Sequence, residues 1–94
     1  REGLPKALIE GAAMGLPIVT TNTVGCRDVV KDGVNGFLVP IKNSIALANA
    51  ILKLIRDEKL RVRMGKESYN LAYSKFSSRI IISQTMDIYN EMIF

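Results

Sequence analysis

A short helix that runs directly into a strand is the feature that most constrains the fold of this chain. Pro5 suits the first helical position, because its φ is already helical and its missing N–H would be unpaired there. Gly15 suits the position after the last turn, where a left-handed residue ends a helix. Residues 16–21 (LPIVTT) are short, β-branched and bounded by turn residues, as expected for a buried parallel strand. A helix followed at once by such a strand predicts an α/β layer structure.

The rest of the chain is predicted to add one further strand and then only helices. One or two helical turns are expected over Cys26–Lys31, and residues 37–39 form the second strand, which Pro40 stops. From residue 43 onward, apolar residues recur at helical spacing. Two strands are few for a parallel sheet. The chain, which begins at Arg1 rather than at a methionine, is therefore expected to be the second half of a doubly wound domain from a longer protein.

Caps and glycines predict the boundaries of the later helices. A helix begins at the Asn-Ser pair of residues 43–44, the Asp-Glu pair of residues 57–58 opens a short helix that Gly65 closes, and the last helix begins at residues 77–78. The positions at helical spacing are Leu4, Leu8 and Ala12, then Ala48, Ile51, Leu52 and Ile55, then Tyr69, Ala72, Tyr73 and Phe76, and finally Ile82, Met86, Tyr89 and Ile93. The first set is expected to form one buried stripe, and the tyrosine and methionine residues at this spacing are expected in the core. The last set forms a broad apolar face that calls for a partner surface.

Composition excludes several classes of function. At 94 residues, with 48% hydrophobic and 23% charged residues, the chain is expected to form one folded domain (residues 1–94) and not a disordered one. No apolar run reaches the ~20 residues of a membrane span. The single cysteine, Cys26, excludes an internal disulfide and favours a cytosolic setting. The absence of histidine excludes Ser–His catalysis and His-ligated zinc, and it favours packing over nucleophilic or redox chemistry for Cys26.

Two glutamates with seven residues between them, Glu2 and Glu10, stand on either side of the first helix start. The helix N-terminus is an anion site, most naturally for phosphate. Glu10 lies ~7.5 Å further along the axis, about where the ribose of a diphosphate nucleotide would lie. Other interpretations stay open from spacing alone: a dipole partner plus a solvated helix residue, a metal site, or a glycosidase acid/base pair.

The order of these motifs resembles the carboxyl-terminal part of the family-four retaining glycosyltransferases, or glycosyl transferases group 1. The residues that carry the resemblance are EGLPKALIEGAAMGLPIVTTNTVGCRDVVKDGVNGFLVP, followed by NSIALANAILKLIRDEKLRVRMG and YSKFS. This family has the GT-B fold, in which two Rossmann-like domains face each other. The resemblance therefore implies an α/β fold, namely part of a Rossmann-like donor-binding domain.

The resemblance also implies roles for named residues. The family's glutamate pair belongs to the nucleotide-sugar site, and here it matches Glu2 and Glu10. Glu10 would hold the ribose hydroxyls, and Glu2 would contact hydroxyls of the donor sugar, which makes Glu2 the expected catalytic residue. Backbone amides near Gly3, Leu4 and Lys6 would meet the sugar and its diphosphate.

The family relation further implies retaining transfer of a sugar to an acceptor hydroxyl, without a metal or a cofactor. The donor is expected to be a nucleoside diphosphate sugar, with uridine as the base. The acceptor would be a sugar or a lipid-linked glycan in polysaccharide synthesis. The missing N-terminal domain of the same chain would be a partner, and the setting would be cytoplasmic and peripheral to the inner face of the membrane. These 94 residues alone are expected to be inactive.

Two further interpretations remain open. A basic run could contact an anionic membrane or could simply be a solvated helical surface; it comprises Lys53, Arg56, Lys59, Arg61, Arg63 and Lys66. Nucleic acid is not expected, because aromatic residues do not interleave with the run. The rival function from another class is a non-catalytic binding or assembly module that uses the broad apolar face of the last helix.

Overall fold

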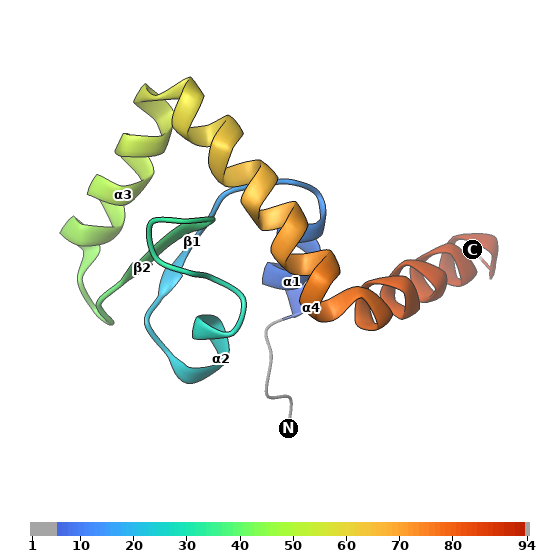
Figure 1. Cartoon of the computed structure of the whole chain (residues 1–94). Helices are drawn as coiled ribbons and strands as arrows, with labels where there is room; N and C mark the ends of the chain where they lie inside the picture. Colours follow the sequence, from blue (N-terminus) through green and yellow to red (C-terminus); the bar gives the residue numbers. More distant parts are fainter. Residues whose placement is uncertain (1–5, 94) are drawn as a thin grey trace.

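The computed structural model describes residues 6–93, with the side chains of residues 6–77. The elements are α1 (Lys6–Ala13), β1 (Ile18–Thr21), α2 (Val24–Arg27), β2 (Gly36–Val39), α3 (Ser44–Arg56) and α4 (Glu58–Ile93) (Figure 1). The two strands pair with each other, α3 lies on one side of them, and α1 and α4 lie on the other (Figure 1). The predicted α/β class is confirmed.

The two strands are parallel, as the sequence predicts. Ile18 lies opposite Gly36 at one end of the pair, and Thr21 lies opposite Val39 at the other. The connection between the strands contains α2, which begins at Val24. The prediction of a helix over Cys26–Lys31 therefore placed this turn two residues too late, because α2 starts directly after the loop that leaves β1.

Asn35 organises the connection between α2 and β2. Its side chain is fully buried, donates to the carbonyl of Val29 (3.0 Å) and accepts from the N–H of Lys31 (2.7 Å). Its backbone carbonyl accepts from the N–H of Ile18 (3.1 Å) and from the hydroxyl of Ser68 (3.0 Å). One buried amide residue thus joins the loop, the first strand and α4, with its polar groups paired as burial requires.

The end of α1 is held by the motif that the sequence predicts. Gly15 has a φ of 78°, which a glycine adopts without the steric penalty of a side chain. Its N–H donates to the carbonyl of Ala12 (2.9 Å), and the N–H of Leu16 donates to the carbonyl of Gly11 (3.2 Å). This pair of bonds is the Schellman motif. The predicted start at Pro5 lies outside the described residues.

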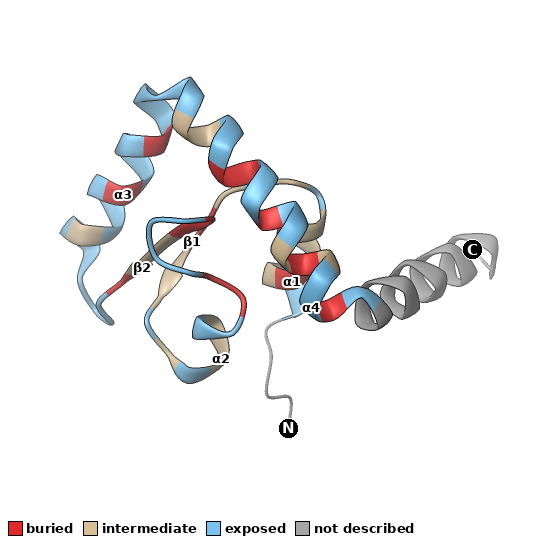
Figure 2. Cartoon of the chain, in the orientation of Figure 1, coloured by how far each residue is buried: buried red, intermediate tan, exposed pale blue. Residues whose placement is uncertain are grey.

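The core lies where α1, β1 and α4 meet, as Figure 2 shows by burial. Its buried side chains are Ile9, Ala12, Ile18, Val29, Val30, Ala72 and Phe76. Ala12, Ala72 and Phe76 stand at the helical spacing found in the sequence, and all three are buried. Leu8 is only half-buried at the edge of this core, whereas Ile9 is buried, so the inner face of α1 runs through Ile9 and Ala12 and not through Leu8.

Gly65 does not end a helix, which corrects the prediction of a short helix over residues 57–65. It lies inside α4, where an added Cβ would collide with the carbonyl oxygen of Gly15. The buried positions of α4 continue past it at four-residue intervals; they are Met64, Ser68, Ala72 and Phe76. Gly65 therefore allows α4 to cross close to the turn after α1.

The buried face of α3 also differs from the apolar pattern in the sequence. Ala50 and Leu54 are buried, whereas Ile51, Leu52 and Ile55 are 42%, 39% and 64% exposed. The pattern correctly predicted a helix but did not identify the face that packs on the strands. The predicted start is confirmed, because Oδ1 of Asn43 accepts from the N–H of Ala46 (2.9 Å).

The predicted helix boundaries at residues 57 and 77 can both be compared with α4. Asp57 caps α4 through the N–H of Leu60 (3.0 Å), and Phe76 departs from helical geometry (φ −128°, ψ 23°), which agrees with a new helix starting at residue 77. Tyr69, expected in the core, is half-exposed, and its ring lies against that of Tyr73 with the ring centroids 4.7 Å apart and the planes tilted by 40°. The broad apolar face over residues 82–93 lies outside the described side chains. None of the described helices is long and apolar enough to span a bilayer.

Candidate functional site

The carboxyl edge of the strand pair gathers the features that could bind an anionic ligand. β1 ends at Thr21 and β2 at Val39 on this edge, and α2 lies beside it (Figure 1). α1 runs opposite to β1, so its N-terminal end also points to this edge, and α3 begins here at Ser44. Helix N-termini carry unpaired N–H groups and the positive end of the helix dipole, which favour anions.

Lys6 and Glu10 lie together on the first turns of α1. The Lys6 ammonium is 4.0 Å from a carboxylate oxygen of Glu10, and their side chains are 68% and 39% exposed. A pair this open to water contributes only about 0.3–0.5 kcal/mol to stability. The arrangement offers a cation nearer the helix start and a carboxylate one turn further along.

The core fixes α1 beneath this pair. Ile9 and Ala12 are buried against Ala72 and Phe76 of α4, so Glu10 lies on a different side of the helix. Local helix geometry thus sets the spacing of Lys6 and Glu10, and α4 sets the direction in which α1 points.

The structure brings together only part of the predicted site. Lys6 and Glu10 are described and share one face of α1. Glu2, Gly3 and Leu4 lie outside the described residues, so their predicted contacts with the donor stay predictions. Within residues 6–77, no three carboxylate or thiol side chains lie close enough together to hold a metal ion.

Two features of the carboxyl edge were missed by sequence reasoning. Nε of Arg27 donates to Oδ1 of Asn22 (2.7 Å) and ties α2 to the loop after β1. An open pocket of about 350 Å³ also lies between the strand ends and the start of α3. Its lining residues are Thr21, Val39, Pro40, Lys42, Asn43, Ser44 and Leu47. The hydrogen bond between Arg27 and Asn22 could have been anticipated, because both polar residues follow the predicted end of the first strand.

Comparison with known proteins decides the family. The model of the glycosyl transferases group 1 family matches residues 1–71. The chain belongs to the group 1 glycosyltransferases. The resemblance read from the motif order is thereby confirmed, and the two parallel strands and later helices agree with part of a Rossmann-like domain of GT-B type.

Relatives of this chain are named as glycosyltransferases with different substrates or products. It is 39% identical over 93 residues to the capsular polysaccharide biosynthesis glycosyltransferase CapM of Staphylococcus aureus, covering 99% of the chain and 24% of the relative. It is 35% identical over 82 residues to a phosphatidyl-myo-inositol mannosyltransferase of Mycobacterium leprae, covering 87% and 22%. It is 29% identical over 93 residues to the N,N'-diacetylbacillosaminyl-diphospho-undecaprenol alpha-1,3-N-acetylgalactosaminyltransferase of Campylobacter jejuni, covering 99% and 24%. The chain thus spans about a quarter of the length of these glycosyltransferases.

Proposed function

We propose that this chain is the nucleotide-binding half of the donor-sugar domain of a glycosyltransferase. The observation that carries the proposal is the placement of Lys6 and Glu10 on one face of α1, at the carboxyl edge of parallel strands. Open α/β sheets bind their ligands at this edge. Membership in the group 1 glycosyltransferases supports a nucleoside diphosphate sugar as the ligand.

The proposed roles follow the order of groups along α1. The helix start and Lys6 face the diphosphate, where anionic oxygens match the dipole and the ammonium. Glu10 accepts hydrogen bonds from the two ribose hydroxyls, and Glu2 binds hydroxyls of the donor sugar. Negative charge develops on the departing diphosphate in the transition state, so groups aimed at it are expected to contribute most to catalysis.

The remaining parts of the proposal concern the whole enzyme. Transfer proceeds with retention of anomeric configuration, without a metal or a cofactor, and uridine is the proposed base of the donor. Two of the relatives are named for lipid or diphospho-undecaprenol substrates, which supports a lipid-linked acceptor for this enzyme too. Such an acceptor favours a cytoplasmic enzyme that works at the inner face of the membrane. Residues that clamp the diphosphate and bind the acceptor would belong to the upstream part of the longer protein.

The ribose assignment is tested by Glu10→Ala in the full-length enzyme. Loss of a charge-assisted hydrogen bond is expected to weaken binding of uridine diphosphate by about 1.5–3 kcal/mol, measured by isothermal titration calorimetry. Glu67→Ala is the matched control, because Glu67 is an exposed glutamate on α4 and its removal should leave the affinity unchanged. An unchanged affinity in Glu10→Ala would rule out the ribose contact.

A further inference from the structure

Asn35 and Gly36, at the start of β2, form the one Asn-Gly dipeptide in the sequence. In a flexible chain this dipeptide loses ammonia readily, because glycine has no side chain to hinder attack by its backbone nitrogen. The nitrogen of Gly36, once its proton has passed to solvent base, bonds to Cγ of Asn35, and the side-chain amide leaves as ammonia. Water then opens the resulting cyclic imide to aspartate or to isoaspartate. An intact chain therefore requires that the fold prevent this reaction.

The structure requires both residues of this dipeptide. An added Cβ at Gly36 would collide with the carbonyl oxygen of Ile18, so only glycine fits opposite β1. The carboxamide of Asn35 donates to the carbonyl of Val29 (3.0 Å) and accepts from the N–H of Lys31 (2.7 Å). Aspartate would keep the acceptor and lose the donor. The fold thus depends on a pair of residues that is chemically reactive.

Four hydrogen bonds form one set, which we call the Asn35 network; it joins Asn35 to Ile18, Val29, Lys31 and Ser68. The two bonds of the carboxamide hold the carbon atom that would be attacked. The Asn35 carbonyl accepts from the N–H of Ile18 and from the hydroxyl of Ser68, and this pairing holds the peptide plane that carries the attacking nitrogen. Ring closure must bring the two together, so the Asn35 network has to open first.

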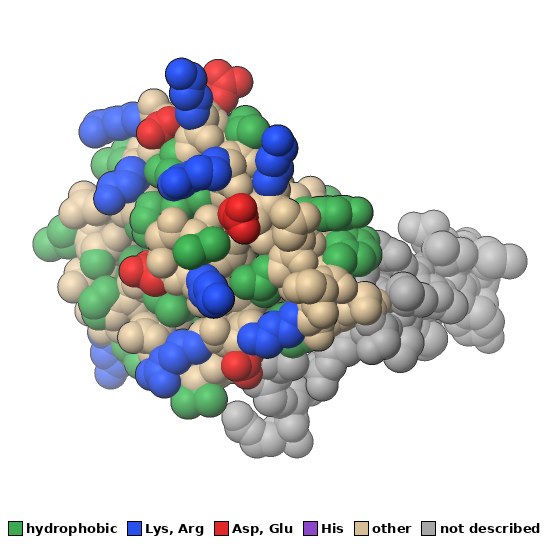
Figure 3. Space-filling view, in the orientation of Figure 1, with side chains coloured by type: hydrophobic (Ala, Val, Ile, Leu, Met, Phe, Trp, Pro, Cys, Tyr) green, Lys and Arg blue, Asp and Glu red, His purple; other side chains and the backbone are tan. Residues whose placement is uncertain are grey.

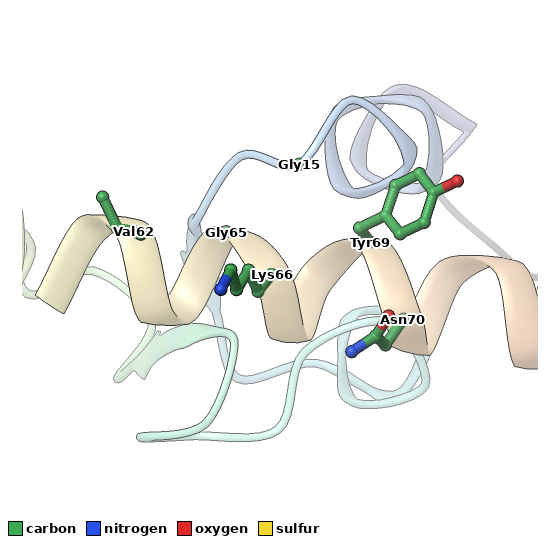
Figure 4. A pocket seen from close by; sticks show the side chains of 6 residues that line it. All are labelled: Gly15, Val62, Gly65, Lys66, Tyr69 and Asn70. Carbon is green, nitrogen blue, oxygen red and sulfur yellow. The ribbon is translucent and has the colours of Figure 1, made fainter. Parts of the chain in front are cut away.

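The Asn35 network also lies away from solvent, behind α4. The outer face of α4 carries Val62 and Tyr69, which line an open pocket of about 570 Å³ (Figure 4). Lys and Arg side chains gather over the α3–α4 junction (Figure 3), where residues 53–67 contain six basic and three acidic residues, a net charge of +3 (6 − 3). Ser68 and Asn35 have no exposed surface. Solvent base therefore does not reach Asn35, and an anionic intermediate would form there without water to stabilise it.

Neither product of the reaction fits the native structure. Aspartate at position 35 would place a second carboxylate oxygen against the carbonyl oxygen of Val29, with no proton between them and a charge in a buried site. Isoaspartate would lengthen the main chain directly before β2. Gly36 would then be displaced from Ile18, at a place where there is no room for an added carbon. A chain that has reacted therefore cannot rebuild the Asn35 network.

We propose that Asn35 is a latent modification site: the native fold blocks its deamidation, and deamidation after opening makes unfolding irreversible. The rate in the native protein is the rate in the unfolded chain multiplied by the fraction of molecules in which the Asn35 network is open. For open fractions of about 10⁻³–10⁻⁶, the native protein reacts at least ~1,000-fold more slowly than the unfolded chain. The working lifetime of the protein is thus limited by how often α4 and the loop before β2 separate.

The test compares the full-length enzyme at mildly alkaline pH in native buffer and in concentrated guanidinium chloride. Trypsin cuts after Lys31 and Lys42, and the peptide of residues 32–42 contains Asn35 as its single side-chain amide. Mass spectrometry of this peptide therefore reports Asn35 alone, and the conversion in native buffer should be slower by the factor of about 1,000 or more given above.

Refolding tests the second part of the proposal. After increasing times in denaturant, the fraction of enzyme that regains cooperative thermal unfolding should fall in step with the converted fraction of the peptide. The same times in denaturant at mildly acidic pH, where the base-dependent attack is suppressed, should leave refolding complete. This control separates deamidation from aggregation.

Two serines of α4 provide a matched pair of variants. Ser68→Ala removes a buried hydrogen bond to the Asn35 carbonyl and should accelerate conversion in native buffer about fivefold, through more frequent opening. Ser74→Ala, at an exposed position whose hydroxyl bonds only within the helix, should leave that rate unchanged. Both variants should react like the wild type in denaturant, where the Asn35 network is absent.

The proposal is overturned if Asn35 reacts as fast in native buffer as in denaturant. It is also overturned if chains that carry aspartate or isoaspartate at position 35 refold as completely as intact chains. None of these measurements involves a sugar donor, so their outcome is independent of the proposed function.

Discussion

Two glycines, Gly15 and Gly65, meet where the turn after α1 crosses α4. Gly15 needs its positive φ to end α1, and Gly65 lies so close to the Gly15 carbonyl that a side chain would collide with it. Gly11 has a different environment: an added Cβ would lie 3.3 Å from Cδ1 of Ile18, the end of a side chain that can move. The two helical glycines should therefore respond differently to the same substitution.

Alanine at position 65 is expected to destabilise the protein, and alanine at position 11 is expected to be neutral or stabilising. Both gain about 1 kcal/mol of helix propensity. At Gly65 the collision with backbone costs about 1–3 kcal/mol or more, since a backbone atom cannot rotate away. Thermal unfolding of Gly65→Ala and Gly11→Ala measures the difference. Equal stabilisation by both substitutions would contradict the close crossing.

At the scale of single residues, Lys6 and Glu10 show which features helix geometry determines and which depend on tertiary packing. Their four-residue spacing places them on one helix face in any α-helix, so their proximity follows from the sequence. Their position at the carboxyl edge depends on α1 packing against α4 through Ile9 and Phe76, which no local pattern indicates.

At the scale of an element, α3 separates helix formation from helix packing. The cap at Asn43 and the apolar spacing both predict this helix, and it begins at Ser44. Apolar residues surround it so broadly that the spacing does not identify the inner face. Contacts of α3 with the strands and with α4 decide this, and they bury Ala50 and Leu54.

Neighbouring residues of α3 therefore provide a matched pair. Leu54→Ala should lower the free energy of unfolding by about 2–3 kcal/mol, as the loss of a buried leucine side chain does. Ile55→Ala should lower the free energy of unfolding by at most about 0.5 kcal/mol, because 64% of the surface of Ile55 is exposed. Denaturant titration of both variants gives the comparison. A larger effect at Ile55 than at Leu54 would mean that α3 is rotated.

At the scale of the whole molecule, the two ends of the strand pair carry different chemistry. The carboxyl edge has helix starts and the pair of Lys6 and Glu10, whereas the α3–α4 junction has most of the net charge. The described residues hold only Lys6 and Glu10 of the proposed donor-binding residues, and the chain covers about a quarter of the length of its relatives.

The 94-residue chain alone should therefore show no sugar transfer. The proposed donor contacts on α1 need opposing basic and acceptor-binding groups from the rest of the enzyme to position the reacting atoms. A radiolabelled uridine diphosphate sugar assay, run with the chain alone and with the full-length enzyme as the positive control, measures this. Measurable transfer by the chain alone would overturn the proposed division of labour.

The sequence by itself determined the α/β class, the two strands, the C-terminal end of α1 and the starts of α3 and α4, and it indicated the glycosyltransferase family. These features depend on local backbone preferences and on motif order, which are written within a few neighbouring residues. Only the tertiary structure decided which face of α3 is buried, that Gly65 continues α4, and that the basic α3–α4 junction lies away from the carboxyl edge of the strands. Each of these features depends on contacts between segments that are distant in sequence, such as Gly15 with Gly65. The local spacing of apolar residues does not predict such contacts.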